Sequence, residues 1–308
     1  MKAGHLNCVE CYASLVEEAN SLRCTGCDAR YHRNQFGFFV LTDLDIVTTD
    51  DDYSRAQELN GKRIYEDYLK PYVLQVPSET ILDVGCGVGH TVNCLIEDGF
   101  DAYGVDLPDL TRFWAKEGNR PEHFFACDGA NLPLEEGLFD VTYSMGAIEH
   151  IGTVLGHCTL DSDYELARKR FANEMLRVTK SGGRILVACP NKSFPLDIQH
   201  GVRDDLTPNS AGNRMRSYIF DRTGVNIHPA WGRYHLLSYS ECKKLFQNTG
   251  NLGSFRPLSL KGYFGFGKFK AGFLKPFANL ANIYVNNLPQ RLWPTFFNPY
   301  MIVEIIKD

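Results

Sequence analysis

The chain has 308 residues, of which 44% are hydrophobic and 22% charged, and its formal net charge is −5. These values are typical of one large globular domain with a small appendage, or of two ordinary domains, and they give no general reason to expect polyanion binding. No run of 18 apolar residues occurs, which excludes a spanning helix, and the N-terminus MKAGHLNCVECY lacks the apolar core of an export signal, so we expect a cytoplasmic protein.

Four of the ten cysteines form two CxxC pairs near the N-terminus, namely Cys8 with Cys11 and Cys24 with Cys27. Two such knuckles present four thiolates, which satisfy tetrahedral zinc and leave no open ligand position. So short a segment cannot stabilise itself by apolar burial, so the metal would supply its folding energy. We predict a structural zinc site, with two disulfides or unrelated pairs as the alternative. The other six cysteines are expected to be reduced, mostly buried thiols.

Residues 6–42, which continue from the knuckles into the aromatic stretch DARYHRNQFGFFVLTD, resemble the zinc ribbon of the small activator subunit of tRNA and protein methyltransferases. That family usually has proline and isoleucine where this chain has His32 and Arg33. We therefore divide the chain into a zinc ribbon at 1–47, an acidic linker with an amphipathic helix at 48–78, and a main domain at 79–308.

The main domain opens with ETILDV, a buried parallel strand by composition, followed by glycines at alternate positions, Gly85, Gly87 and Gly89, and then a helix. This order places backbone amides at a helix N-terminus, where a nucleotide can approach closely. His90 stands where a dinucleotide fold needs its third glycine. Asp83, at the strand end, suits a cationic amino acid group better than a pyrophosphate. A purely structural tight turn is the alternative.

Two further acids follow at the expected distances. Asp106 ends a second strand about twenty residues after the loop, where a carboxylate can bind both ribose hydroxyls. Asp128 follows a third strand, and its carboxylate can accept the adenine amino group while the amide of Gly129 meets a ring nitrogen. A fourth strand in FDVTYSM, a helix at about 163–179, a turn KSGG and a fifth strand RILVACPN come next.

Residues 79–192 resemble class I S-adenosylmethionine-dependent methyltransferases of the type related to ubiquinone and sugar O-methyltransferases. The matching pieces are ILDVGCGVG, YGVDL, CDGANLPL, FDVTYSMGAIEHI and LRVTKSGGRILVACPN. The resemblance implies a Rossmann-like α/β fold, with a seven-stranded sheet, helices on both faces and an antiparallel last strand. NLGSFRPLSL and PYMIVEIIKD are the expected sixth and seventh strands. It also implies these donor-binding residues: Asp83, Gly85, Cys86, Gly87, Gly89, Asp106, Leu107, Asp128, Gly129 and Met145.

The candidates for chemistry follow the fourth and fifth strands. His150 is a candidate general base for a hydroxyl acceptor, because an imidazole accepts a proton near neutral pH. Alternatively, Glu149 and His150 could hold a magnesium-type divalent metal with a later histidine, by similarity to ubiquinone and small-RNA methyltransferases, although Gly146 stands where those families carry another acid. His200 is the best third polar group. A helix cap at Glu149, packing of His150 and a solvated loop at His200 are the structural alternatives.

Two inserted segments, 195–237 and 261–298, are expected to act as lids that decide acceptor choice. From 254 to 303 the chain has no Asp or Glu but six Lys or Arg among many aromatic residues. This composition fits peripheral membrane contact through 255–297, a lipid-linked acceptor or single-stranded nucleic acid, and equally a flap with its aromatics turned inward.

We expect an enzyme that uses S-adenosylmethionine to methylate an oxygen of a glycan, lipid-linked sugar or secondary metabolite. RNA methylation is the alternative within this class, suggested by the ribbon and the basic segment and opposed by the overall acidity. A zinc-ribbon scaffold without turnover is the alternative of another class. The three acids Asp83, Asp106 and Asp128 argue against the scaffold, because a site that had lost its activity would not need them.

Overall fold

The computed structural model describes most of the chain, namely residues 5–44, 60–74, 79–154, 158–201, 211–228, 232–264 and 275–308. Most of the predicted linker and parts of both predicted lids therefore lie outside the described residues. None of the described helices is long and apolar enough to cross a membrane.

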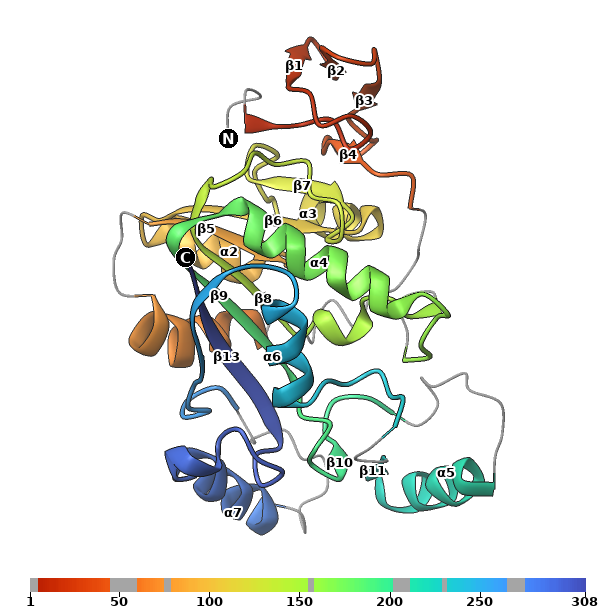
Figure 1. Ribbon diagram of the computed structural model, residues 1–308, viewed down its shortest axis with the longest axis vertical. Coiled ribbons are helices and arrows are strands. Elements are labelled where there is room, and N and C mark those ends of the chain that lie inside the picture. Colours follow the sequence, from red (N-terminus) through yellow and green to blue (C-terminus); the bar gives the residue numbers. More distant parts are fainter. Residues whose placement is uncertain are drawn as a thin grey trace.

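One eight-stranded sheet forms the centre of the molecule, with the strand order β12-β13-β9-β8-β5-β6-β7-β4 (Figure 1). Strands β4 to β9 run parallel to their neighbours, whereas β13 is antiparallel to both β9 and β12. The Rossmann-like α/β fold and the antiparallel last strand are thus confirmed. The strands are β4 (Val40–Leu41), β5 (Thr80–Val84), β6 (Asp101–Asp106), β7 (Phe124–Cys127), β8 (Phe139–Met145), β9 (Thr179–Pro190), β12 (Leu252–Pro257) and β13 (Tyr300–Lys307).

Helices cover both faces of this sheet, which explains why its inner strands are buried almost throughout. On one face, α4 (Tyr164–Val178) and α6 (Tyr239–Gln247) pack against the sheet in one hydrophobic cluster. On the other face, α2 (His90–Glu97) and α3 (Thr111–Lys116) contribute to a second cluster. Successive residues of β5, such as Ile81 and Leu82, point to opposite faces and enter different clusters, as the period of two in a strand requires.

The sheet has one strand more than the seven expected, because β4 comes from the N-terminal segment. It pairs in parallel with the edge strand β7, so that Leu41 lies opposite Cys127. Next to it the ribbon forms a small antiparallel sheet of β1 (Leu15–Glu18), β2 (Ser21–Cys24) and β3 (Arg30–His32) at this edge of the molecule (Figure 1). An uncovered edge strand exposes unpaired backbone groups, and the ribbon removes that exposure from β7.

The ribbon and the main domain also share a core. Leu6, Leu15 and Leu22 of the ribbon are buried in the same cluster as Leu134 of the main domain. The backbone amide of Asn7 donates to the carbonyl of Pro133 at 3.0 Å, and His5 contacts Glu135 at 2.8 Å. The ribbon is therefore built into the main domain.

The N-terminal helix expected at 55–75 is observed from residue 60 onward, the earlier part lying outside the described residues. Its second half, η2 (Tyr65–Val73), has π-type hydrogen bonding and contains Pro71. Arg63 at its start donates to the backbone carbonyl of Tyr263 at 2.5 Å, which ties this helix to the segment after β12.

Most of the remaining elements lie after β8. The expected KSGG turn is a bulge in β9, where pairing with β8 jumps from Thr179 to Arg184. The predicted lids contain two helices and a two-stranded pair at the far end of the molecule from the ribbon (Figure 1). They are β10 (Leu196–Asp197), α5 (Ala211–Thr223), β11 (Asn226–Ile227) and α7 (Lys275–Asn286). Short 3-10 turns follow β6 at η3 (Pro108–Leu110), β8 at η4 (Ile148–His150) and α7 at η9 (Gln290–Leu292).

Candidate functional site

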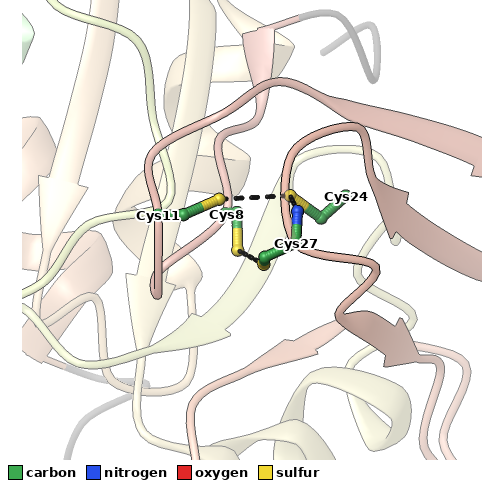
Figure 2. A group of neighbouring side chains, drawn as sticks. All are labelled: Cys8, Cys11, Cys24 and Cys27. Carbon is green, nitrogen blue, oxygen red and sulfur yellow. Dashed lines mark hydrogen bonds between the residues drawn. The ribbon is translucent and has the colours of Figure 1, made fainter.

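The four ribbon thiols converge as the spacing suggested (Figure 2). All four sulfurs lie within 4.8 Å of one another, with 3.6 Å between Cys8 and Cys27 and 3.4 Å between Cys11 and Cys24. These distances are far too long for disulfides and close to those between ligands of one tetrahedral zinc ion. Backbone amides point at Cys8 and Cys24, an arrangement that stabilises thiolates. The arrangement therefore fits a structural zinc ion.

The glycine loop after β5 is held tightly in place. Gly85 and Gly89 have φ angles of +84° and +86°, in the left-handed region that favours glycine. A Cβ at Gly89 would lie 2.5 Å from the Phe124 ring and from the Asn119 side chain. The carbonyl of Gly87 accepts a hydrogen bond from the Trp114 indole at 2.7 Å. The loop conformation is thus fixed by its surroundings. The loop places backbone groups without side chains at the start of α2.

Asp83, Asp106 and Asp128 lie at the carboxyl ends of the adjacent strands β5, β6 and β7, the edge at which parallel α/β sheets bind ligands. Asp106 accepts hydrogen bonds from the amides of Gly87 and Leu107, both at 2.7 Å. Burial raises its pKa to about 6, and these two amides oppose the shift. Asp128 accepts from the amide of Ala130 at 2.8 Å. Asp83 and Asp106 thus lie next to the glycine loop, and Asp128 lies at the end of the next strand.

Asp83 is buried beside a small cavity. Burial raises its pKa to about 8, while the nearby Tyr143 hydroxyl opposes the shift. The cavity measures about 50 Å³ and is lined by the strand ends, the glycine loop and the N-terminal helix: Asn60, Gly61, Ile64, Leu69, Asp83, Gly85, Cys86, Thr91, Tyr143 and Met145. That volume holds only a few water molecules. The space at Asp83 is therefore too small for a nucleotide-sized ligand in this conformation.

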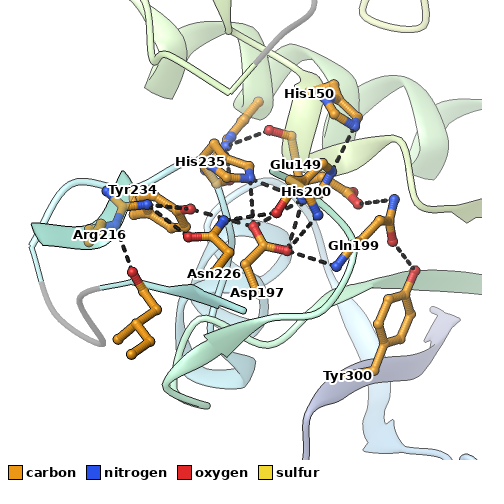
Figure 3. A network of polar contacts seen from close by, with 12 residues as sticks. Glu149, His150, Asp197, Gln199, His200, Arg216, Asn226, Tyr234, His235 and Tyr300 are labelled. Carbon is orange, nitrogen blue, oxygen red and sulfur yellow. Dashed lines mark hydrogen bonds and ion pairs between the residues drawn. The ribbon is translucent and has the colours of Figure 1, made fainter. Parts of the chain in front are cut away.

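A network of buried polar side chains follows directly after β8 (Figure 3). His200 lies at its centre. Its Nε2 is 3.2 Å from Nε2 of His150, and its Nδ1 is 3.1 Å from both carboxylate oxygens of Asp197. His235 lies behind, with Nε2 3.3 Å from Nδ1 of His200 and 3.4 Å from Asp197. Tyr234 adds a hydroxyl 3.4 Å from the same carboxylate. Two histidines, His200 and His235, therefore share one carboxylate, and His150 is connected to it through His200.

The charges in this network are strongly perturbed. Asp197 is buried, yet its contacts with His200 and His235 hold its pKa well below the usual range. Burial lowers the pKa of His235, so this ring favours its neutral form. Burial raises the pKa of Glu149 to about 7, with the charge of His200 opposing the shift. Such perturbed groups in one place are typical of a catalytic site.

The network lies next to the glycine loop. Gly146 and Ala147 connect the two, since a Cβ at Gly85 would lie 2.5 Å from the Cβ of Ala147. A Cβ at Gly146 would in turn lie 3.5 Å from the Gln199 amide and 3.5 Å from the Tyr300 hydroxyl. One short loop therefore contacts the glycine loop on one side and the polar network on the other.

The structure brings Glu149, His150 and His200 into one network, as expected of the candidate catalytic residues. Glu149 does not cap a helix; it is fully buried, and its Oε1 is 3.5 Å from Gln199. Sequence reasoning gave no role to Asp197 and read His235 as structural or substrate-flanking. The i, i+3 spacing of Asp197 and His200 was the available signal, whereas nothing in the local sequence pointed to His235.

The same residues were tested for a metal. Within the described chain, two triads outside the ribbon have suitable spacing, one of His150, Cys158 and His200 and one of Asp197, His200 and His235. Glu149 belongs to neither. Magnesium prefers oxygen ligands in octahedral geometry, which these nitrogen- and sulfur-rich sets do not supply. The set does not fit the magnesium site considered from the sequence.

Residues 82–187 match the family model described as a methyltransferase domain. This segment, about a third of the chain, is similar to methyltransferase domains. It contains the glycine loop, the three acids, Glu149 and His150, whereas Asp197, His200 and His235 lie beyond it.

Individual relatives match only part of the chain. The 2-methyl-6-phytyl-1,4-hydroquinone methyltransferase of Synechocystis sp. is 33% identical over 116 residues, which cover 36% of this chain and 32% of that protein. "Probable tRNA methyltransferase 9B" of Homo sapiens is 30% identical over 122 residues, covering 37% of this chain and 22% of that protein. The chain thus spans less than half the length of these relatives.

Among solved structures, a complex of the Haloferax volcanii Trm112 methyltransferase activator with a methyltransferase is similar to this chain. It shows 14% identity and a TM-score of 0.48, over 84% of this chain and 95% of that chain.

Proposed function

We propose that this protein transfers a methyl group from S-adenosylmethionine to a hydroxyl oxygen of a glycan, a lipid-linked sugar or another secondary metabolite. The observation that carries this proposal is the Asp197–His200–His150 relay, which stands one short loop away from the donor acids. Methyl transfer to an alcohol needs a proton acceptor beside the acceptor oxygen, and the relay supplies one.

Each donor acid has a distinct role in this proposal. Asp83 would pair with the donor's ammonium group, and Asp106, already fixed by two loop amides, would accept the ribose hydroxyls. Asp128 would accept the adenine amino group beside the amide of Gly129. Met145 and Cys86 line the cavity at Asp83 and would contact the methionine part. S-adenosylmethionine supplies an activated methyl group on a sulfonium, whose thioether leaves as a neutral group.

Donor binding should depend on pH in a way that reports Asp83. Its pKa of about 8 means that the carboxyl is mostly protonated at neutral pH and must lose this proton to pair with the ammonium. Affinity should therefore rise by up to about tenfold per unit from about pH 6 toward pH 8, and fall above pH 8 as the donor's own amino group, with a pKa of about 8, loses its charge. Calorimetric titrations across this range, with Asp83→Asn as the control that removes the rise, measure it.

The relay can hold the acceptor's proton. Asp197 stays ionised and accepts from Nδ1–H of His200, which leaves the lone pair of His200 on Nε2, directed at His150. A proton taken from the acceptor by His150 is then shared across the 3.2 Å contact and stabilised by the Asp197 carboxylate. Because the leaving thioether is neutral, the remaining work is alignment of the oxygen behind the methyl group.

The acceptor class is supported by the surface of the second lid. α7 exposes Leu280 and Ile283, each about 60% accessible, and the nearby turn exposes Phe296. Apolar side chains in a segment free of acids suit a lipid surface or a lipid-linked acceptor. The similarity to a phytyl-hydroquinone methyltransferase agrees with an acceptor that carries an apolar chain.

The acceptor proposal is tested by methyl incorporation from labelled donor. The zinc-loaded protein is offered extracted lipid-linked glycans, a polar metabolite fraction and total RNA, each with and without magnesium. We expect label in the lipid-linked or metabolite fraction, independent of magnesium. Label confined to RNA would replace the proposal with RNA methylation, and donor binding without transfer to any fraction would favour the scaffold alternative.

A further inference from the structure

A second, larger cavity adjoins the histidine network through Tyr234, which lines it and contacts Asp197. It measures about 490 Å³, within the range of small-molecule sites, and is formed by α4, α6 and the loop before α6. Its apolar wall includes Tyr164, Leu236, Leu237 and Leu245. None of the individual residues predicted to bind the donor or to act in catalysis lines it, although five lining residues between Gly232 and Leu237 belong to the first predicted lid.

Most charged side chains around this cavity are cationic, although the whole chain has a net negative charge. Five cationic side chains face two carboxylates, of which Glu241 is paired with Lys192 at 2.6 Å. The other four cations have no carboxylate within ion-pair distance among the residues that the structure describes: Arg168, Lys169, Arg233 and Lys244. So many cations around one hollow attract an anion that carries more than one charge.

Arg168 is the most informative of the four, because only 6% of it is exposed. Its guanidinium donates to three backbone carbonyls, those of Glu149, Ile151 and His235, at 3.3, 3.1 and 2.5 Å. Carbonyls satisfy its donors without neutralising its charge. A buried cation without a counter-ion is costly, and an anion in the adjoining cavity would remove that cost.

We propose that this cavity binds the phosphate or diphosphate group of a small organic molecule. Arg168 and Arg233 flank the Tyr164 ring at 5.4 and 5.6 Å, and Lys169 and Lys244 stand at the rim on α4 and α6. Arginine forks match phosphate oxygens well, and the leucines and tyrosines suit the organic part.

The same residues connect the cavity to the relay. Arg168 holds the backbone of Glu149 and His235, and Tyr234 lines the cavity while its hydroxyl lies 3.4 Å from Asp197. A phosphate that draws Arg168 toward itself alters the support of both catalytic segments. Occupation of the cavity therefore changes turnover. This consequence rests on the proposed methyl transfer, whereas the binding of the phosphate group does not depend on that proposal.

The test uses inorganic pyrophosphate as the probe, titrated calorimetrically into the zinc-loaded full chain at low ionic strength. Lys169→Glu and Lys244→Glu reverse a charge at the rim, and Arg170→Glu and Lys243→Glu reverse the charge of a neighbour on the same helix that does not line the cavity. We expect saturable binding that weakens by about tenfold or more in each rim variant and changes little in the two controls. Equal weakening in all four variants, or no saturable binding by the unaltered chain, would overturn the proposal.

Two further arms refine the result. S-adenosylmethionine titrated into the same samples should bind all four variants alike. This measurement distinguishes a failure of the donor site from a failure of the phosphate site. Pyrophosphate that competes with the acceptor would show that the phosphate belongs to the acceptor, and a change in kcat without competition would show a separate effector; both retain the site. A single-stranded RNA that binds in place of pyrophosphate, with the same loss in the rim variants, would contradict the small-molecule assignment.

Discussion

Replacing His150 with alanine should lower kcat by about 100- to 10,000-fold, the usual contribution of a general base. The substitution removes the imidazole that lies 3.2 Å from His200 and leaves the donor acids untouched. Donor affinity should therefore stay unchanged while the rate of methyl incorporation falls. Asp197→Asn should act in the same direction, because it removes the charge that stabilises protonated His200.

His32→Ala is the matched control, since this histidine is exposed on β3 in the ribbon's separate sheet, whereas the relay follows β8 and β9 of the main sheet. Its turnover should equal that of the unaltered protein. If His150→Ala retained full turnover, the relay would not be the proton acceptor. A parallel loss of donor binding would instead assign His150 a structural role.

Removing the ribbon's metal ligands should destabilise the whole protein. In a Cys8→Ser/Cys24→Ser double variant, two buried ligands of the thiol cluster are lost. Zinc supplies most of the folding free energy of such small sites, and this ribbon shares its core and the strand β4 with the main domain. We expect the midpoint of thermal unfolding to fall by on the order of 10 °C or more, in a single transition.

The control is Cys94→Ser on α2, a half-buried thiol outside the cluster, which should shift the midpoint by a few degrees at most. Metal content of each purified variant should be measured alongside, with about one zinc per chain in the unaltered protein and the control. An unchanged thermal unfolding transition of the main domain in the double variant would mean that the ribbon folds as a separate unit and does not stabilise the sheet.

The order of elements in the main sheet could be predicted because each strand and acid follows a local pattern. Continuous β-branched or apolar runs gave the buried strands, and the alternate glycines fixed the turn at Gly85 to Gly89. The eighth strand could not be predicted, because two residues at Val40–Leu41 carry no periodic signal. Their pairing with β7 is decided by the shared core.

The candidate site likewise has a part that could be predicted from the sequence and a part that could not. The acids and His150 lie at strand ends, whose place in the sheet follows from topology. Asp197, His200 and His235 come from insertions after β9, where no repeating pattern places one side chain against another. The basic cavity was missed because Arg168, Arg233 and Lys244 belong to three separate segments that meet only in the folded chain.

Titration of S-adenosylmethionine into the zinc-loaded protein at pH 7, in buffers of different ionisation enthalpy, tests the donor pocket most directly. The pocket proposed around Asp83, Asp106 and Asp128 predicts one molecule bound per chain, with release of close to one proton that is absent in Asp83→Asn. The absence of binding, or binding that is indifferent to Asp83 and Asp106, would contradict it.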